Sequence, residues 1–184
     1  MSTGSNHNIS DNDLVIGCIS KNRKMQEILY NKYAAKMYSV CLRYSNNAED
    51  AQDLLQEGFV KLFNNIEKYR GDGSFEGWVR RIFVNTSIEY YRRKTKINLV
   101  PETNDNTVED KEWNALDSFA EKDIIKLIQE LSPGYRQVFC LYAIEGYSHK
   151  EIGDMMGISE GTSKSQLARA KTILKKLVEE RLSL

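Results

Sequence analysis

Three carboxylates and one amide in the segment 48–66 have the spacing that acid–base chemistry could use. They recur about one helical turn apart, so one helix face would present them together: Glu49, Asp53, Gln56 and Glu57. Paired carboxylates can act as general acid and base, but that chemistry also needs a cleft and a nucleophile or metal ion, and the sequence offers neither. We therefore expect no catalytic residue and no enzyme, with an enzyme built on these carboxylates as an alternative. A solvated acidic face or an acidic docking face for a basic partner are the other interpretations.

Polar and basic residues near the C-terminal end have the types that suit a DNA groove. Ser148 and Glu151 fit a capping box at a helix start. Gly157 then permits a tight turn, and Ser159 can cap a second helix. Small polar tips can contact base edges in the major groove while cations neutralise phosphates, so we predict a duplex-DNA contact. The alternative is an ordinary helical hairpin with a solvated basic face. The predicted contact residues are Thr162, Lys164, Ser165, Arg169 and Lys171.

A second basic region lies between residues 80 and 96. The periodicity predicts a helix over 75–96 whose inner face includes Phe75. Aromatic rings beside guanidinium groups are typical of surfaces that bind single-stranded nucleic acid, and Trp78 and Tyr91 border such a stripe. Alternatively, these two aromatic residues belong to the core or its boundary. The predicted stripe is Arg81, Asn85, Ile88 and Arg92.

Helices must position all of these residues, because the sequence contains no convincing strand and no internal repeat. We expect an all-α fold of two small helical domains, at 11–97 and 117–184, joined by an acidic flexible linker at 98–116. Residues 1–10 are polar and should be disordered. Helices are predicted over about 14–19, 25–44, 48–66, 75–96, 119–131, 133–142, 148–156 and 160–178.

Composition narrows the classes of function. The net charge of the 184 residues is zero, which predicts weak nonspecific affinity for duplex DNA in spite of the two basic regions. Cys18, Cys41 and Cys140 are isolated and odd in number, which indicates a reducing compartment and gives no zinc-site spacing. We expect no metal and no cofactor. The absence of a signal pattern and of a long apolar run predicts a cytoplasmic protein without membrane insertion.

Four stretches follow one another in the chain: ILYNKYAAKMYSVCLRY, DAQDLLQEGFVKLF, YRGDGSFEGWVRRIFVNTSIEYYRRK and LSPGYRQVFCLYAIEGYSHKEIGDMMGISEGTSKSQLARAK. In this order they resemble bacterial RNA polymerase sigma factors of the extracytoplasmic-function (ECF) group of the sigma-70 family. The resemblance covers nearly all of 11–177 and implies sigma region 2 at 11–97 and sigma region 4 at 117–184. Such a protein binds core RNA polymerase, directs it to specific promoters and helps to melt the minus-10 element. Whether an anti-sigma factor is a further partner stays open, and a DNA-binding regulator that acts without polymerase is the rival.

The resemblance also implies roles for individual residues. The DLLQEGF helix resembles region 2.2, which docks on the clamp helices of the largest polymerase subunit. This resemblance implies that Asp53, Gln56 and Glu57 bind core polymerase. The terminal helix resembles the part of region 4 that binds the minus-35 duplex. Ser163 and Gln166 depart from the aliphatic residue and the Arg common there, so the minus-35 sequence preference is not carried over. The YRGDGSF loop and the following helix resemble the regions that hold the opened minus-10 strand, through Arg70, Phe75, Trp78, Arg81, Asn85 and Arg92.

Overall fold

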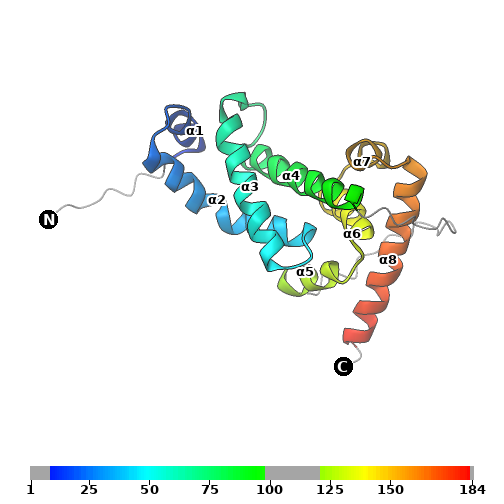
Figure 1. Ribbon diagram of the computed structural model, residues 1–184. Coiled ribbons are helices and arrows are strands. Elements are labelled where there is room, and N and C mark those ends of the chain that lie inside the picture. The colour runs from blue at the N-terminus through cyan, green and yellow to red at the C-terminus, as the bar shows by residue number, and fades with distance from the viewer. Residues whose placement is uncertain (1–8, 98–120, 183–184) are drawn as a thin grey trace.

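The computed structural model describes residues 9–97 and 121–182, and within these ranges the regular elements are all helices (Figure 1). The predicted all-α fold is therefore confirmed, while the predicted linker at 98–116 lies outside the described residues. The elements in order are α1 (Asp11–Ile19), α2 (Arg23–Tyr44), α3 (Ala48–Asn65), the 3₁₀ turn η1 (Ile66–Lys68), α4 (Phe75–Ile97), α5 (Glu121–Gln129), α6 (Pro133–Phe139), the π-helical turn η2 (Cys140–Ile144), α7 (His149–Met156) and α8 (Glu160–Leu182).

Polar side chains fix where the helices of the first half begin. Ser10 and Asp13 form a reciprocal capping box at the start of α1. The side chain of Asn22 accepts amide hydrogens of the first turn of α2, and the predicted cap at Asn47 does the same for α3. Ser10 belongs to the segment 1–10 that the sequence predicts to be disordered, but its hydrogen bonds with Asp13 hold it at the helix start.

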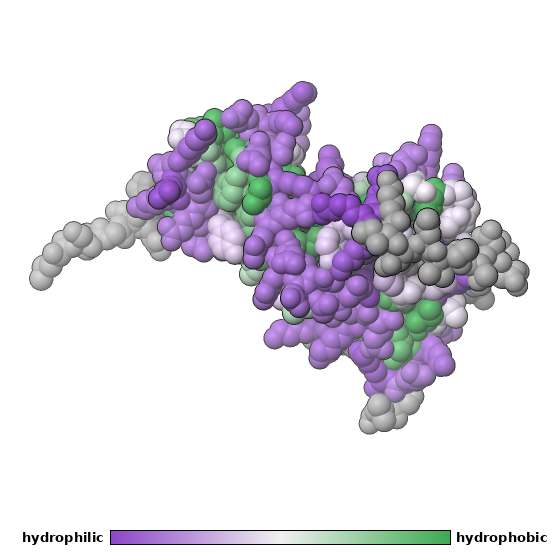
Figure 2. Space-filling view, in the orientation of Figure 1, coloured by the Kyte–Doolittle hydropathy of each residue, from purple (hydrophilic) through white to green (hydrophobic). Residues whose placement is uncertain are grey.

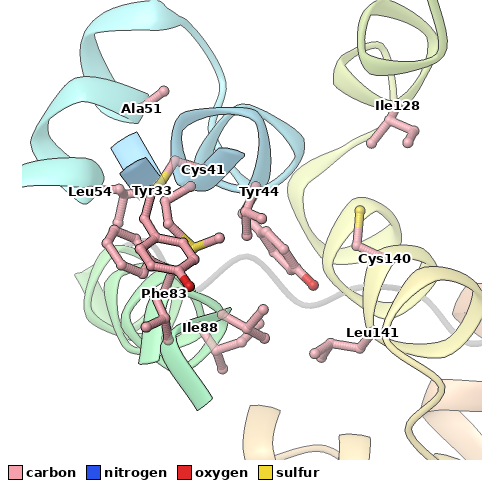
Figure 3. Packing of buried hydrophobic residues seen from close by; sticks show 14 of the residues in the cluster. Tyr33, Cys41, Tyr44, Ala51, Leu54, Phe83, Ile88, Ile128, Cys140 and Leu141 are labelled. Carbon is pink, nitrogen blue, oxygen red and sulfur yellow. The ribbon is translucent and has the colours of Figure 1, made fainter. Parts of the chain in front are cut away.

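The first half buries a core shared by α2, α3 and α4. Leu29, Tyr33, Leu54 and Phe83 are each at most 2% exposed, and Figure 3 shows three of them meeting between these helices. Burying a side chain of this size stabilises the fold by roughly 1.5–3 kcal/mol. Gly58 of α3 permits the close approach of α4, because a Cβ at this position would lie only 2.3 Å from the Phe83 ring.

The second half, α5 to α8, contains the predicted helix-turn-helix. The capping box of Ser148 and Glu151 begins α7, and Gly157 ends it in the left-handed region at φ 74°. The Ser159 hydroxyl accepts an amide hydrogen from the first turn of α8 at 3.0 Å. Gly153 allows the turn to fold back on α7, since a Cβ there would lie 2.8 Å from the Ile158 carbonyl oxygen. The sequence therefore predicts this motif correctly at each of its caps.

The two halves contact each other directly. One buried apolar cluster continues from the first half into the second, and α5 and α6 pack against α2 while α7 packs against α4. In Figure 3 the Tyr44 side chain points from α2 towards the space between Ile88 of α4 and Leu141 of η2. The predicted division into two helical units holds for the order of the helices, but their cores meet at the C-terminal end of α2.

Candidate nucleic-acid interface

One side of α4 presents the residues expected to hold a single strand. Arg81, Asn85 and Arg92 are exposed on this helix, and Arg70 is exposed in the loop before it. Trp78 is half-buried and lies one turn before Arg81. At 3.6 residues a turn, the three exposed residues and Trp78 fall on the same side of α4. An aromatic ring, two guanidinium groups and an amide are thus available together to bases and phosphates.

An aromatic cluster beneath this side supports Trp78. Its ring lies 5.8 Å from Phe75, nearly parallel, and 5.5 Å from Tyr69. Phe75 is only 3% exposed, so the expectation that it lies on the DNA-contacting surface is corrected. The reason is that Phe75 begins α4 with its ring packed against both Tyr33 and Tyr69. Phe75 therefore packs beneath Trp78 and supports its ring, and Trp78 is the aromatic residue of this cluster that remains at the surface.

The other residues of the basic region serve the fold. Ile88 is 3% exposed, so it does not belong to the exposed stripe in which the sequence places it. Arg93 forms an ion pair with Glu57 at 2.9 Å, and Lys94 forms one with Asp50 at 3.1 Å. Both acids lie on α3, so these two cations tie α4 to α3. Some cations of the 80–96 segment are therefore paired with acids of α3, and only the others are available to a nucleic acid.

Helix α8 carries the residues expected to contact duplex DNA. Lys164 is exposed and pairs with Glu160 at 2.7 Å within the helix. The Arg169 guanidinium donates a hydrogen bond to the Tyr135 hydroxyl at 3.3 Å, which links α8 to α6. The other members of the set are Thr162, Ser165 and Lys171, all half-buried. The structure thus places the five predicted residues on one helix, close to the turn.

Three aromatic side chains of the second half, Tyr135, Tyr142 and His149, are not among the predicted site residues. The Tyr142 ring stacks on the His149 ring with centroids 4.5 Å apart, and the Lys171 ammonium lies 5.9 Å from the Tyr142 ring. Tyr135 thus contacts Arg169 and Tyr142 contacts Lys171, two of the predicted DNA-contacting cations. The signal in the sequence that could have identified these tyrosines is the tyrosine content of the run LSPGYRQVFCLYAIEGY, which periodicity alone assigns to an apolar face.

The acidic face of α3 is divided between solvent and the fold. Asp53 and Gln56 are exposed, whereas Glu57 is half-buried and pairs with Lys61 at 3.0 Å and with Arg93. Burial tends to raise the pKa of Glu57, but the hydrogen bonds from the two cations outweigh it and hold this pKa below its usual value. Asp53 and Gln56 are therefore the side chains that a partner can reach, and Glu57 stabilises the surface beside them.

An exposed aliphatic residue extends this face of α3. Val60 is 59% exposed, and it lies four residues, about one helical turn, after Gln56. Val60 is not among the residues that the sequence predicts for this surface. An aliphatic residue on the polar side of an amphipathic helix was the signal that could have identified it. With Asp53 and Gln56, it gives this face both polar and apolar exposed side chains, as protein-docking surfaces have.

Two classes of site are not found in residues 9–97 and 121–182. No group of three or more His, Cys, Asp or Glu side chains is placed to hold a metal ion there. Nor does any helix in these ranges have the length and apolar character needed to cross a membrane. Fold and site together define a class: an all-α protein with a helix-turn-helix and a second basic helix that carries aromatic residues.

Comparison with known proteins identifies the family. Residues 29–97 match the model for sigma-70 region 2, and residues 121–174 match that for sigma-70 region 4. The chain therefore belongs to the sigma-70 family of RNA polymerase sigma factors, in its ECF group.

Curated relatives agree with this assignment. The ECF RNA polymerase sigma factor SigE of Mycolicibacterium smegmatis is 34% identical over 80% of this chain. That match spans 59% of the relative, so the chain covers less than two thirds of it. The ECF RNA polymerase sigma-E factor of Haemophilus influenzae is 27% identical over 93% of this chain and 96% of its own length.

A solved structure has a related fold. It is the co-crystal structure of the sigma factor RpoE with the anti-sigma factor NepR from Bartonella quintana. RpoE matches 83% of this chain and 96% of its own, with a TM-score of 0.50 and 19% sequence identity. At that identity the likeness concerns the fold alone.

Proposed function

We propose that this chain is a promoter-specificity subunit of RNA polymerase. It binds core polymerase, directs it to a restricted set of promoters and helps to melt the minus-10 element. The observation that supports this proposal most strongly is the pairing, in one chain of the sigma-70 family, of a capped helix-turn-helix with a separate exposed stripe on α4. A duplex contact needs only the first, while opening a duplex needs the second.

Each surface has a separate role in this proposal. Asp53, Gln56 and Val60 on α3 contact the clamp helices of the largest polymerase subunit. The stripe of Trp78 and Asn85, with the arginines beside them, holds the extruded minus-10 strand. Unstacking a base costs a few kcal/mol, and stacking on an aromatic ring returns roughly 1–3 kcal/mol per base. The α8 residues bind the minus-35 element as duplex.

The same proposal has consequences for chemistry, location and partners. The protein contributes binding energy and has no catalytic centre of its own, since polymerase carries out RNA synthesis. It acts where the chromosome is, in the cytoplasm. Membership of the ECF group also makes an anti-sigma factor a partner to be tested.

Transcription in vitro tests the proposed function. Purified bacterial core polymerase is supplied with a library of promoter fragments, with and without the chain, and transcripts are sequenced. We expect initiation at a limited set of promoters only when the chain is present. Duplex binding by the chain without any selective initiation would favour the rival function, a regulator that acts without polymerase.

A further inference from the structure

The Arg169 side chain is bonded to a helix that lies outside the helix-turn-helix. Its Nη1 atom donates a hydrogen bond of 3.3 Å to the hydroxyl of Tyr135, which lies on α6. Both side chains are half-buried. A hydrogen bond requires a particular direction as well as a distance, so it restricts how the planar guanidinium can turn. The orientation of Arg169 therefore depends on α6 as well as on its own helix.

Tyr135 is carried by a firmly placed segment. Pro133 occupies the first turn of α6, where its fixed backbone angle suits a helix start. Arg136, directly after Tyr135, is 3% exposed and donates to the carbonyls of Gln129 and Leu131, both at 2.8 Å. Helix α6 also packs along α8 (Figure 1). The backbone at Tyr135 is thus fixed by contacts within the protein, without DNA.

Two other cations expected to contact DNA are placed by contacts of a different kind. The Lys171 ammonium lies 5.9 Å from the Tyr142 ring, and such an attraction draws a cation to the ring face without fixing its donor directions. Lys164 pairs at 2.7 Å with an acid of its own helix, and exposed pairs of this kind restrict a side chain little. The hydrogen bond between Arg169 and Tyr135 differs from both, because it joins two helices and has a required direction.

Arg169 lies where small polar side chains gather on α8. Thr162 and Ser165 precede it by seven and four residues, about two turns and one turn, so the three residues share one side of the helix. Figure 2 shows apolar side chains at the surface of the C-terminal part of α8, and Ile173 there is 36% exposed. The side of α8 that suits base edges therefore belongs to its N-terminal part, where Tyr135 adjoins Arg169.

A guanidinium that is already oriented can discriminate bases better than a mobile one. It carries several N–H donors in one rigid plane, so a bond to Tyr135 leaves the group able to make a two-point contact with a base edge. That contact forms only when the guanidinium lies in the plane of the base. An arginine that is free to turn must lose this freedom on binding, which weakens the contact.

We propose that Tyr135 is a positioning residue for the duplex contact: its hydroxyl orients the Arg169 guanidinium and thereby increases the discrimination among bases at the position that Arg169 contacts. The part that concerns DNA rests on the proposed function, whereas the orientation of Arg169 does not. The surface that reads bases then consists of α8 together with one residue of α6.

A positioning role and a structural role leave different signatures. Contacts to phosphates place a protein on the duplex without reading its sequence, so loss of such a contact weakens binding to all sequences alike. General damage to the fold does the same. Loss of the Tyr135 hydroxyl should instead act at one base pair and only while an arginine is present at residue 169.

The first arm measures the orientation of Arg169 in the free full-length chain. Tyr135→Phe removes the hydroxyl and keeps the ring. NMR relaxation of the arginine Nε–H groups reports their fast motion, and the signal of Arg169 is identified by its loss in Arg169→Lys. We expect this group to be more mobile in Tyr135→Phe than in the wild type. Equal mobility in the two proteins would overturn the proposal.

Tyr147→Phe is the matched control for this arm. Tyr147 is also half-buried in the second half, but it lies directly before the cap of α7 and not on α6. Its loss of a hydroxyl should leave the mobility of Arg169 unchanged. Urea unfolding of the full-length chain must show that Tyr135→Phe still folds cooperatively. An increase in mobility that is equally large in Tyr147→Phe would overturn a specific role for Tyr135.

The second arm measures base discrimination in complex with core polymerase. Binding is compared over promoter fragments that differ by single base pairs in the minus-35 element. We expect Tyr135→Phe to reduce the preference at one position about three- to tenfold, the size of effect that one hydrogen bond or one immobilised side chain has. Arg169→Lys keeps the charge but lacks the planar fork, so it should reduce the preference at the same position.

The combined variant decides how Tyr135 acts. If Tyr135 works through Arg169, Tyr135→Phe will cause no further loss of preference in the Arg169→Lys background. A further loss in that background, or a loss that is uniform over all sequences, would overturn the positioning role. A wild-type complex without any promoter preference would count against the proposed function, and the first arm would still decide whether Tyr135 orients Arg169.

Discussion

The Nδ1 atom of His149 lies 2.9 Å from the Oγ atom of Ser163, which joins the first residue of α7 to the inner side of α8. Ser163 is fully buried, and the sequence marked it as a departure from the aliphatic residue common at this position. The structure gives a reason for the departure: the hydroxyl has a ring nitrogen as its partner. A side-chain hydrogen bond between α7 and α8 thus helps to hold the helix-turn-helix of this chain together.

Removal of that hydroxyl should weaken the second half. We expect Ser163→Ala to lower the free energy of unfolding by about 0.5–1.5 kcal/mol, the usual net value of one hydrogen bond. Urea unfolding measures the change. Ser165→Ala is the matched control, because Ser165 lies on the outer side of α8 and should affect DNA binding more than stability. An equal stability loss in both variants would remove the special role of the His149–Ser163 pair.

Arg169 should discriminate between bases. If its guanidinium contacts a base edge, Arg169→Ala will cost about 1–3 kcal/mol, concentrated at one position of the minus-35 element. Binding of holoenzyme to a set of single-base promoter variants measures this. Lys175→Ala, which changes an exposed cation farther along α8, is the control. A uniform loss over all sequences would make Arg169 a phosphate contact.

Core binding should depend on the exposed part of the acidic face. We expect Asp53→Lys combined with Val60→Glu to reduce the affinity for core polymerase at least tenfold, because both side chains are exposed and unfolding should be unaffected. Glu67→Lys reverses an exposed acid outside α3 and should bind normally. Competition against a labelled sigma factor gives the affinities. Unchanged binding by the double variant would remove α3 as the docking surface.

Glu57 should make the stability of the first half depend on acid. Its folded-state pKa lies below the usual 4.5, so its ion pairs contribute fully above that pH and are lost as the pH falls through the folded-state value. We expect Glu57→Gln to be less stable than the wild type at pH 7, with the difference shrinking as the pH falls below 4.5. Urea unfolding over this range is the measurement. Asp53→Asn, on the same helix, controls for the loss of one negative charge.

Local signals made the motifs predictable. The capping box at Ser148 and Glu151 and the left-handed turn at Gly157 depend on a few neighbouring residues, so the sequence contains the whole cause. The periodicity also placed Phe75 on the inner face of its helix, and only the role implied by the resemblance put it at the DNA surface. Ile88 was placed wrongly for a different reason. A helix packed on several neighbours buries a wider arc than its apolar stripe indicates, and α4 contacts α2, α3 and α7.

The burial of Arg136 could not be predicted from periodicity. A helix pattern assigns an arginine such as Arg136 to solvent, since a buried guanidinium is favourable only where acceptors are already arranged. Two of the four acceptors, the Ser45 carbonyl and the Asn46 side chain, lie about ninety residues earlier in the chain, at the end of α2. The acceptors at the end of α2 reach Arg136 only because the two halves contact each other, and the sequence did not predict that contact.

Strand opening at the minus-10 element tests the central claim most directly. Permanganate oxidises unpaired thymines, so a promoter bound by core polymerase and this chain should become reactive around minus 10. The Asn85→Ala variant should bind the promoter duplex nearly as well but lose most of that reactivity, while Trp78→Phe should retain much of it. Melting that is unaffected by Asn85→Ala and Trp78→Ala, or duplex binding without any melting by the wild-type chain, would contradict the account.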